Sequence, residues 1–207
     1  MSTAARAATR DKLIVFVKAP RPGTVKTRLA AALGDDAACL AYRTLVETLL
    51  QNLAPLNEVE LRYTPDDAAK EIEPWLRAGW KSQPQGDGDL GERLKRAFAE
   101  SFRNGFQRVV IIGSDCPQVS PQDIAEAWSA LGESDVALGP ATDGGYWLIG
   151  LCAEQPALFC DMPWSMSGVF NETLRRAEEL NLKASTLRTL SDVDTLTDWQ
   201  KFQTERR

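Results

Sequence analysis

A basic loop follows the first apolar run of the sequence and could bind phosphate. Lys18, Arg21, Lys26 and Arg28 place four cations within eleven residues around Gly23. The loop leads into a segment with helical spacing, and the N–H groups at a helix start attract anions, which basic side chains can then clamp. The alternative is a solvated basic turn. A Walker-type ATPase is disfavoured, because the spacing G-x-x-x-x-G-K-[ST] is absent.

A second candidate is Asp115, which follows the apolar run RVVIIG after Ser114 and precedes Cys116-Pro117. A carboxylate at the end of a buried strand faces the crevice where α/β sheets bind ligands. It can hold Mg²⁺ or Mn²⁺ against a diphosphate. The alternative is that Asp115 only caps the turn before Pro117, which is a common role for Asp.

A third candidate combines an acid with a glycine pair, in the run Asp143, Gly144, Gly145, Tyr146. Paired glycines let the backbone approach a ligand closely. Asp143 could then bind a sugar hydroxyl, a metal or an acceptor. The alternative is a hairpin turn, because Asp-Gly and Gly-Gly are strong hairpin signals.

Two later segments could border the same site. Asp192 and Asp194 precede a helix start, so one acid could complete a metal site while the other caps the helix, or both could cap. Trp164 and Ser165 lie in a loop that contains proline and could wall a pocket. A packed surface tryptophan is the alternative.

The run GDGDLG, residues 86–91, matches the dinucleotide-binding pattern G-x-G-x-x-G by letter. We reject that interpretation, because no convincing apolar strand precedes the run and its two carboxylates would repel a pyrophosphate. Asp89 is instead expected to cap the following helix. The loop, with Gly91, could still border the site and contribute to nucleotide binding.

The sequence contains no histidine, which restricts the chemistry more than any other feature of composition. Ser-His and Cys-His nucleophile pairs and His-ligated zinc are excluded. Acid–base or metal chemistry must therefore use Asp, Glu, Lys, Tyr or Cys, and oxygen ligands favour Mg²⁺ or Mn²⁺. The four cysteines show no Cys-x-x-Cys spacing, so we expect reduced thiols and a cytoplasmic protein.

Strands and helices that could position these loops alternate along the chain. Apolar runs and alternation predict strands at 13–17, 59–63, 80–83, 108–113, 136–138 and 147–151. Helical spacing predicts helices at 25–53, 66–77, 90–102, 121–131 and 167–180, with another start near 196. We expect Gly34 to split the first helix, Asp66 to cap the second and Ser120 to cap the fourth.

This alternation predicts a single α/β domain, a mainly parallel sheet flanked by helices. Ligands of such sheets bind beyond the carboxyl ends of the strands, where the basic loop and Asp115 would meet. We expect residues 13–207 to form the domain and residues 1–12 to be a disordered tail. The length of 207 residues and 43% hydrophobic content suit one core.

Composition also limits the partners. The net charge of −5 comes from interleaved acids and bases, which leaves no broad basic face for nucleic acid. No apolar run is long enough to insert into a membrane. We therefore expect small-molecule partners, a nucleotide-activated molecule and a small acceptor, while the oligomeric state stays open.

Taken together, the loops resemble a known family. The order KAPRPGTVKTRL, GDGDLGERL, GSDCP, ATDGGYWLIG, PWSMSGVF and DVDTLTDW is similar to bacterial nucleotide-diphospho-sugar transferase-like proteins with the glycosyltransferase-A fold, of the arsenosugar-biosynthesis type. The similarity runs from about residue 13 to residue 202. The chain also resembles, more distantly, phospholactate guanylyltransferase.

The resemblance implies roles for individual residues. It implies metal binding by Asp115 and Asp194, and phosphate contacts by Lys18, Lys26 and Arg28. The pattern departs from both relatives: one acid stands where many glycosyltransferases carry Asp-x-Asp, and PRPGTVKTR replaces the G-x-G-T-R loop of the guanylyltransferase.

The leading hypothesis is metal-assisted glycosyl transfer from a nucleotide-diphosphate sugar to a small acceptor. A metal on Asp115, with Lys26 and Arg28, would neutralise the departing diphosphate, and Asp143 could orient the sugar or act as the base. Nucleotidyl transfer from a nucleoside triphosphate to a phosphorylated molecule, with pyrophosphate release, is the second hypothesis. A nucleotide-binding module without catalysis is the third.

Overall fold

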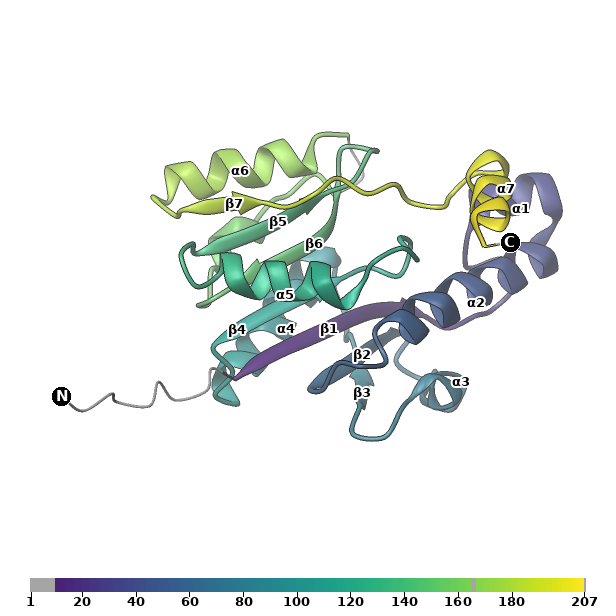
Figure 1. Ribbon diagram of the computed structural model, residues 1–207, viewed down its shortest axis with the longest axis horizontal. Coiled ribbons are helices and arrows are strands. Elements are labelled where there is room, and N and C mark those ends of the chain that lie inside the picture. The colour runs from purple at the N-terminus through teal and green to yellow at the C-terminus, as the bar shows by residue number, and fades with distance from the viewer. Residues whose placement is uncertain (1–9, 165–166, 207) are drawn as a thin grey trace.

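The computed structural model describes residues 10–164 and 167–206. Within them, seven strands form one sheet in the order β3-β2-β1-β4-β6-β5-β7 (Figure 1). Their bounds are β1 (Asp11–Lys18), β2 (Val59–Thr64), β3 (Lys81–Pro84), β4 (Arg108–Ile112), β5 (Val136–Pro140), β6 (Tyr146–Leu151) and β7 (Ala184–Thr186). Only β6 runs antiparallel to its neighbours β4 and β5. The expected α/β fold with a mainly parallel sheet is confirmed.

Helices connect these strands. Their bounds are α1 (Thr27–Leu33), α2 (Asp35–Asn52), α3 (Ala69–Ile72), α4 (Leu90–Arg103), α5 (Pro121–Ala130), α6 (Val169–Glu179) and α7 (Leu196–Glu205), with short 3₁₀ turns at Glu73–Trp75 and Pro156–Phe159. Gly34 separates α1 from α2, as expected. Among the described residues, no helix combines the length and apolar character that crossing a membrane requires.

The sheet lies between two helical layers, and each layer has its own apolar core. On one face, side chains of α2 and α5 pack with alternate residues of β1, such as Leu13 and Val15. On the other face, α4 and α6 pack around Ile14. Because successive strand residues point to opposite faces, a strand covered on both sides must be apolar throughout. This is why β1 and β4 appear in the sequence as continuous apolar runs.

The C-terminal helix α7 completes a smaller layer beside α1 and α2, beyond the sheet (Figure 1). Its Trp199 packs near Leu29 of α1, and Phe202 packs with Leu45 of α2 and with Val193. The chain crosses the molecule between β7 and α7, and this crossing segment carries residues 187–195 past the ends of the strands. The acids at 192 and 194 reach the sheet edge in this way.

Several local expectations need correction. Where a helix was expected at 66–77, only the single turn of α3 forms, followed by a 3₁₀ turn. Its N-cap is Ala68 rather than Asp66. Pro74 explains the short helix, because proline in a helix interior removes a hydrogen bond and clashes with the preceding turn. Strand β1 begins at Asp11, two residues before the expected start. Strand β7 was not expected at all.

The helix caps agree better with expectation. Ser120 caps α5 in a reciprocal capping box with Asp123. Asp89 caps α4 by accepting a hydrogen bond from the N–H of Glu92. At α7, by contrast, neither Asp192 nor Asp194 caps, because Thr195 forms the capping box. Those two acids are thereby left for other contacts.

Candidate active site

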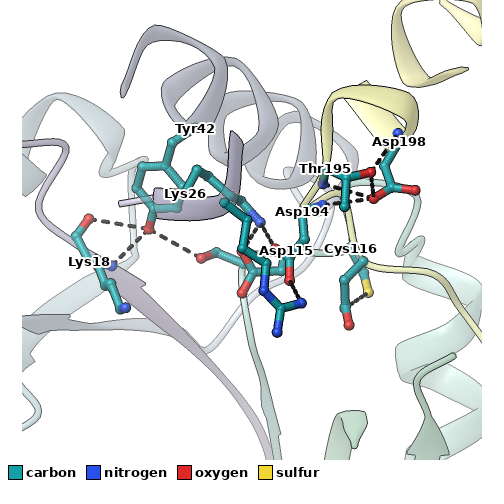
Figure 2. A network of polar contacts seen from close by, with 11 residues as sticks. Lys18, Lys26, Tyr42, Asp115, Cys116, Asp194, Thr195 and Asp198 are labelled. Atoms are coloured by element: carbon teal, nitrogen blue, oxygen red, sulfur yellow. Dashed lines mark hydrogen bonds and ion pairs between the residues drawn. The ribbon is translucent and has the colours of Figure 1, made fainter. Parts of the chain in front are cut away.

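The carboxyl ends of β1 and β4 meet the segment before α7 at one edge of the sheet, and their side chains form an ion cluster (Figure 2). Lys26 Nζ forms a short hydrogen bond with Asp115 and donates a second, 2.8 Å long, to Asp194 Oδ1. The Lys26 side chain is only 3% exposed, whereas half of the Asp115 side chain faces solvent. The fold therefore joins the basic loop to both acids that the sequence singled out.

The backbone at Lys26 holds this geometry. Lys26 lies at the N-cap of α1 with φ of 48°, in the left-handed region that L residues seldom adopt. Burial lowers the pKa of Lys26, but the carboxylates of Asp115 and Asp194 outweigh it, so the net shift is upward. The ammonium is thus positively charged at neutral pH.

Hydrogen bonds behind the cluster fix the two strand ends. Tyr42 of α2 accepts a 2.8 Å hydrogen bond from the N–H of Lys18, and its hydroxyl lies 3.2 Å from Ser114 Oγ (Figure 2). Burial raises the pKa of Tyr42, so the hydroxyl stays neutral. The N–H of Val193 donates to the carbonyl of Asp115 at 3.0 Å, which ties the crossing segment to the β4 loop. Direct hydrogen bonds therefore fix the positions of these loops relative to one another.

Asp192 lies next to the cluster on its inner side. It accepts a 2.8 Å hydrogen bond from the Cys116 thiol. Burial, and then the negative charges of Asp143, Asp115 and Asp194, raise the pKa of Asp192 to about 6 against the weaker effect of that hydrogen bond. Burial is thus the main cause of the raised pKa of Asp192, and the neighbouring carboxylates add to it.

Two adjoining cavities open at this edge. The larger, about 840 Å³, is lined by four basic side chains, those of Lys18, Lys26, Arg28 and Arg93. The smaller, about 590 Å³, is lined among others by Asp143, Asp192, Tyr146, Trp164 and Ser167. Both cavities share seven lining residues, which are Arg28, Leu90, Gly113, Asp115, Tyr146, Trp147 and Asp194. Asp115 thus lies where the two cavities meet.

The loop of Asp143, Gly144 and Gly145 is a hairpin connection that also faces the smaller cavity. It joins β5 to β6, and Asp143 Oδ1 accepts a 2.8 Å hydrogen bond from the N–H of Gly145. Gly144 has φ of 92°, and a Cβ there would lie 2.9 Å from the N of Gly168. Its carbonyl accepts hydrogen bonds from the N–H groups of Gly168 and Phe170. The loop is therefore a hairpin turn, and its Asp143 and Gly145 also line the smaller cavity.

Some expected site residues have other surroundings. Arg21 is engaged by Glu71 and Asp67, at 2.6 and 2.9 Å, and lines neither cavity. Gly23, Gly91 and Gly144 also stay out of both linings. Ser165 lies outside the described residues.

Gly91 has a structural reason of its own. A Cβ at this position would lie 2.8 Å from the carbonyl oxygen of Phe159 and 3.1 Å from Trp164 Nε1. Glycine therefore allows the start of α4 to approach the wall of the smaller cavity closely. The short strand β3, which precedes the 86–91 loop, is polar, in agreement with the expectation that no apolar strand precedes this run.

The sequence pattern missed several contributors. Gln85 is buried and donates to the carbonyls of Val17 and Arg62, at 3.1 and 3.0 Å, while Arg93 donates to its side-chain oxygen at 3.3 Å. Tyr42 of α2 bonds the N–H of Lys18 and was not singled out by the sequence. No local pattern marks such residues, because their partners lie on other elements.

Asp115 and Asp194 suit a divalent cation. Both place a carboxylate oxygen within hydrogen-bond reach of the same Lys26 nitrogen, so the two acids converge on one position for a cation. Mg²⁺ is commonly held by one or two carboxylates together with substrate phosphates and waters. Among the described residues, no group of three or more Asp, Glu, Cys or His side chains could hold a metal ion without such help. The two carboxylates therefore fit a metal that arrives with a phosphate substrate.

Known proteins share this architecture. A Desulfovibrio desulfuricans G20 protein, provisionally assigned as a nucleotide-diphospho-sugar transferase, is 34% identical with a TM-score of 0.88, over 97% of this chain and 89% of that one. A cytidylyltransferase from Leptospira borgpetersenii has a TM-score of 0.60 at 12% identity, over 95% of this chain and 86% of that one, which shows the shared fold alone.

Sequence comparison adds a curated relative and a family. Phosphoenolpyruvate guanylyltransferase of Sphaerobacter thermophilus is 28% identical over 127 residues, which are 61% of this chain and 61% of that protein. The match thus spans about three fifths of the relative's length. A family model matches residues 48–166, which begin near the C-terminal end of α2. The chain therefore belongs to the family described as "Uncharacterized protein conserved in bacteria (DUF2064)".

Proposed function

We propose that this protein is a transferase that acts on a nucleotide-activated substrate, and that the reaction is glycosyl transfer from a nucleotide-diphosphate sugar to a small acceptor. The observation that carries the proposal is the meeting of a cation-lined cavity with a second cavity at Asp115. A diphosphate suits the first cavity and the transferred group suits the second. The bond that breaks would then lie at their junction.

In this reaction the bond between the anomeric carbon and the diphosphate oxygen breaks, and its electron pair leaves with the diphosphate. Lys18, Lys26 and Arg28 are placed to stabilise the charge that grows there. Asp115 and Asp194 are placed to hold Mg²⁺ or Mn²⁺, which when bound supplies further positive charge to the diphosphate. The acceptor oxygen forms the new bond to carbon.

Asp143 is the proposed base for that step. It is exposed and lines the smaller cavity, so its carboxylate can orient an acceptor hydroxyl and take its proton. Tyr146 and Trp164 form an aromatic wall of the same cavity. A wall of this kind suits the apolar face of a sugar ring.

Nucleotidyl transfer is the second candidate, and the similarity to a phosphoenolpyruvate guanylyltransferase favours it. Incubation with a panel of nucleotide sugars and nucleoside triphosphates, with Mg²⁺ or Mn²⁺, separates the reactions. Release of free nucleoside diphosphate supports glycosyl transfer, and release of pyrophosphate supports nucleotidyl transfer. Tight binding with neither product would support a nucleotide-binding module without catalysis.

The metal role is tested with Asp115→Asn, which keeps the size of the side chain and removes its charge. We expect metal-dependent nucleotide binding to weaken about tenfold or more, measured by calorimetry with and without Mg²⁺. Asp135→Asn is the matched control. Asp135 lies at the amino end of β5, away from the site, and its carboxylate accepts a hydrogen bond from the N–H of Lys183. Undiminished metal-dependent binding in Asp115→Asn would remove the basis for this assignment.

A further inference from the structure

The two adjoining cavities carry opposite charge. Among the described residues that line the larger cavity, four are basic and only Asp115 and Asp194 are acidic. Among those that line the smaller cavity, four are acidic, namely Asp115, Asp143, Asp192 and Asp194, and Arg28 is the one base. A ligand that spans both cavities therefore meets a positive and a negative environment at its two ends.

The acids of the smaller cavity are unevenly neutralised, because Asp115 and Asp194 form ion pairs with Lys26 whereas the other two do not. Arg28 approaches Asp194 only to 3.9 Å, and the Arg28 side chain is 75% exposed. Among the described residues, no base forms an ion pair with Asp143 or Asp192. A phosphate or carboxylate beside Asp143 and Asp192 would meet like charges, with only the exposed Arg28 among the lining bases to offset them.

The same cavity offers what a hydroxyl-bearing ring needs. Carboxylates accept hydrogen bonds from hydroxyl groups, and Tyr146, Trp147 and Trp164 add aromatic surface. The Tyr146 hydroxyl and Trp164 Nε1 are buried without a hydrogen-bond partner, so two donors at this wall are not used by the protein. Buried donors of this kind usually have a partner.

We infer that the smaller cavity takes an uncharged, polyhydroxylated group and rejects groups that carry phosphate or carboxylate. The inference rests on the proposed function for the neighbouring cavity. It also separates this protein from a relative whose name specifies phosphoenolpyruvate, since that molecule carries both excluded groups. The polyhydroxylated group is either the sugar of the nucleotide donor or a free acceptor.

Calorimetry at pH 7.5 tests the inference with known probes. UDP-glucose, GDP-mannose and dTDP-glucose are compared with their own nucleoside diphosphates, and glucose, glycerol and phosphoenolpyruvate are titrated into protein with and without GDP. We expect at least one sugar to add about tenfold or more in affinity, or a free polyol to bind. Phosphoenolpyruvate should not bind when GDP already occupies the larger, cation-lined cavity. The first result identifies the donor sugar as the occupant, and the second identifies an acceptor.

The double variant Asp143→Asn with Asp192→Asn supplies the charge test. Asparagine keeps the oxygen that accepts from the N–H of Gly145 and the oxygen that accepts from the Cys116 thiol, so folding should be preserved. We expect the sugar contribution to fall about tenfold and phosphoenolpyruvate binding to become measurable. The control Asp135→Asn should bind sugar and phosphoenolpyruvate as the wild type does. Each single variant should show affinities between those of the wild type and the double variant.

The inference is overturned if, in the presence of GDP, phosphoenolpyruvate binds the wild type as tightly as it binds the double variant, or if neither sugar nor polyol contributes to binding. These results differ from failure of the proposed function, which would appear as absence of binding by every nucleotide. Titration of glucose and glycerol without GDP reports on the smaller cavity even in that case, because these uncharged molecules are not drawn to the larger, basic cavity.

Discussion

At the scale of single residues, Lys26 has the most constrained position in the site. It adopts a left-handed backbone conformation, is nearly buried, and contacts both acids of the cluster. A lysine in such a position neutralises the two carboxylates when no other cation is present. It would also attract the phosphate that the larger cavity is proposed to hold.

Lys26→Met is therefore expected to weaken the binding of nucleoside diphosphates about tenfold or more, because methionine keeps much of the apolar volume and leaves the two acids unneutralised. Calorimetric titration with GDP and UDP measures the loss. Lys201→Met, at an exposed position on α7, is the control. Equal affinity of Lys26→Met and wild type would show that Lys26 does not contact phosphate.

Gly139 is constrained by a neighbouring ring. A Cβ at this position would lie 2.6 Å from Trp147 Nε1, and that nitrogen already donates a 3.1 Å hydrogen bond to the carbonyl of Arg188. The indole cannot move aside without losing this bond, and Trp147 lines both cavities. Gly139 is therefore needed for the shape of the site wall.

We expect Gly139→Ala to lower the free energy of unfolding by about 1–3 kcal/mol, which is the usual cost of overpacking a core. Urea denaturation followed by far-UV circular dichroism measures it. Gly113→Ala is the control, because its new methyl group would meet no atom within 4 Å. A change of less than about 0.5 kcal/mol in Gly139→Ala would mean that the indole relaxes freely.

At the scale of elements, Tyr42 of α2 joins the end of β1 to the loop after β4. Its hydroxyl accepts a hydrogen bond from the N–H of Lys18 in β1 and forms another with the hydroxyl of Ser114, which follows β4. The site loops therefore depend on a helix that carries none of their chemistry. A single buried hydroxyl has this effect because the N–H at the end of a strand needs a partner.

Tyr42→Phe is expected to lower the free energy of unfolding by about 1–3 kcal/mol, because the partly buried N–H of Lys18 loses its acceptor. Chemical denaturation measures the change. The control is Tyr63→Phe in β2, where the structure describes no hydrogen bond from the hydroxyl of that buried residue. If both variants lose the same stability, the Tyr42 hydroxyl is not a specific link.

Elements differ in how much the sequence reveals about them. The continuous apolar runs of β1 and β4 and the caps of α4 and α5 are local signals, and the structure confirms them. Strand β7 is only three residues long and partly exposed, and it exists because β5 offers it a parallel edge. Such a strand has no pattern of its own to recognise.

At the scale of the whole molecule, a buried ion network lies near the amino ends of β1 and β2, at the end of the strands opposite the candidate site. Glu60 accepts from Lys12 at 2.7 Å and from Arg62 at 2.6 Å, while Arg62 also bonds Glu100 at 2.5 Å. Burial raises the pKa of Glu60, but the hydrogen bond from Lys12 and the charge of Arg62 outweigh it, so the net shift is downward. The network links β1, β2 and α4 away from the candidate active site.

The lowered pKa sets the direction of a pH dependence. Because Glu60 binds its proton more weakly in the folded than in the unfolded protein, its stabilising effect is complete above the unfolded pKa of about 4.3. It is lost as the pH falls through the lower folded pKa. Glu60→Gln should therefore cost about 3–5 kcal/mol at pH 7, where it leaves buried cations unpaired.

The difference between Glu60→Gln and wild type should shrink when urea denaturation is repeated below pH 4. Glu133→Gln, an exposed acid between α5 and β5, should show no such trend. A difference that stays constant between pH 7 and pH 3.5 would contradict the ionised state of Glu60 in the native protein.

The sequence by itself determined the apolar runs of the main strands, the caps of α4 and α5, the exclusion of histidine chemistry and the set of candidate loops. These follow from local composition and spacing. Only the tertiary structure decided which of the loops meet. Lys26 bonds Asp115 and Asp194, which lie 89 and 168 positions later in the sequence, while Arg21 from the same loop forms an ion pair with Glu71 instead. The physical reason is that charge pairing across a sheet edge depends on strand order and crossings, which act between segments distant in sequence.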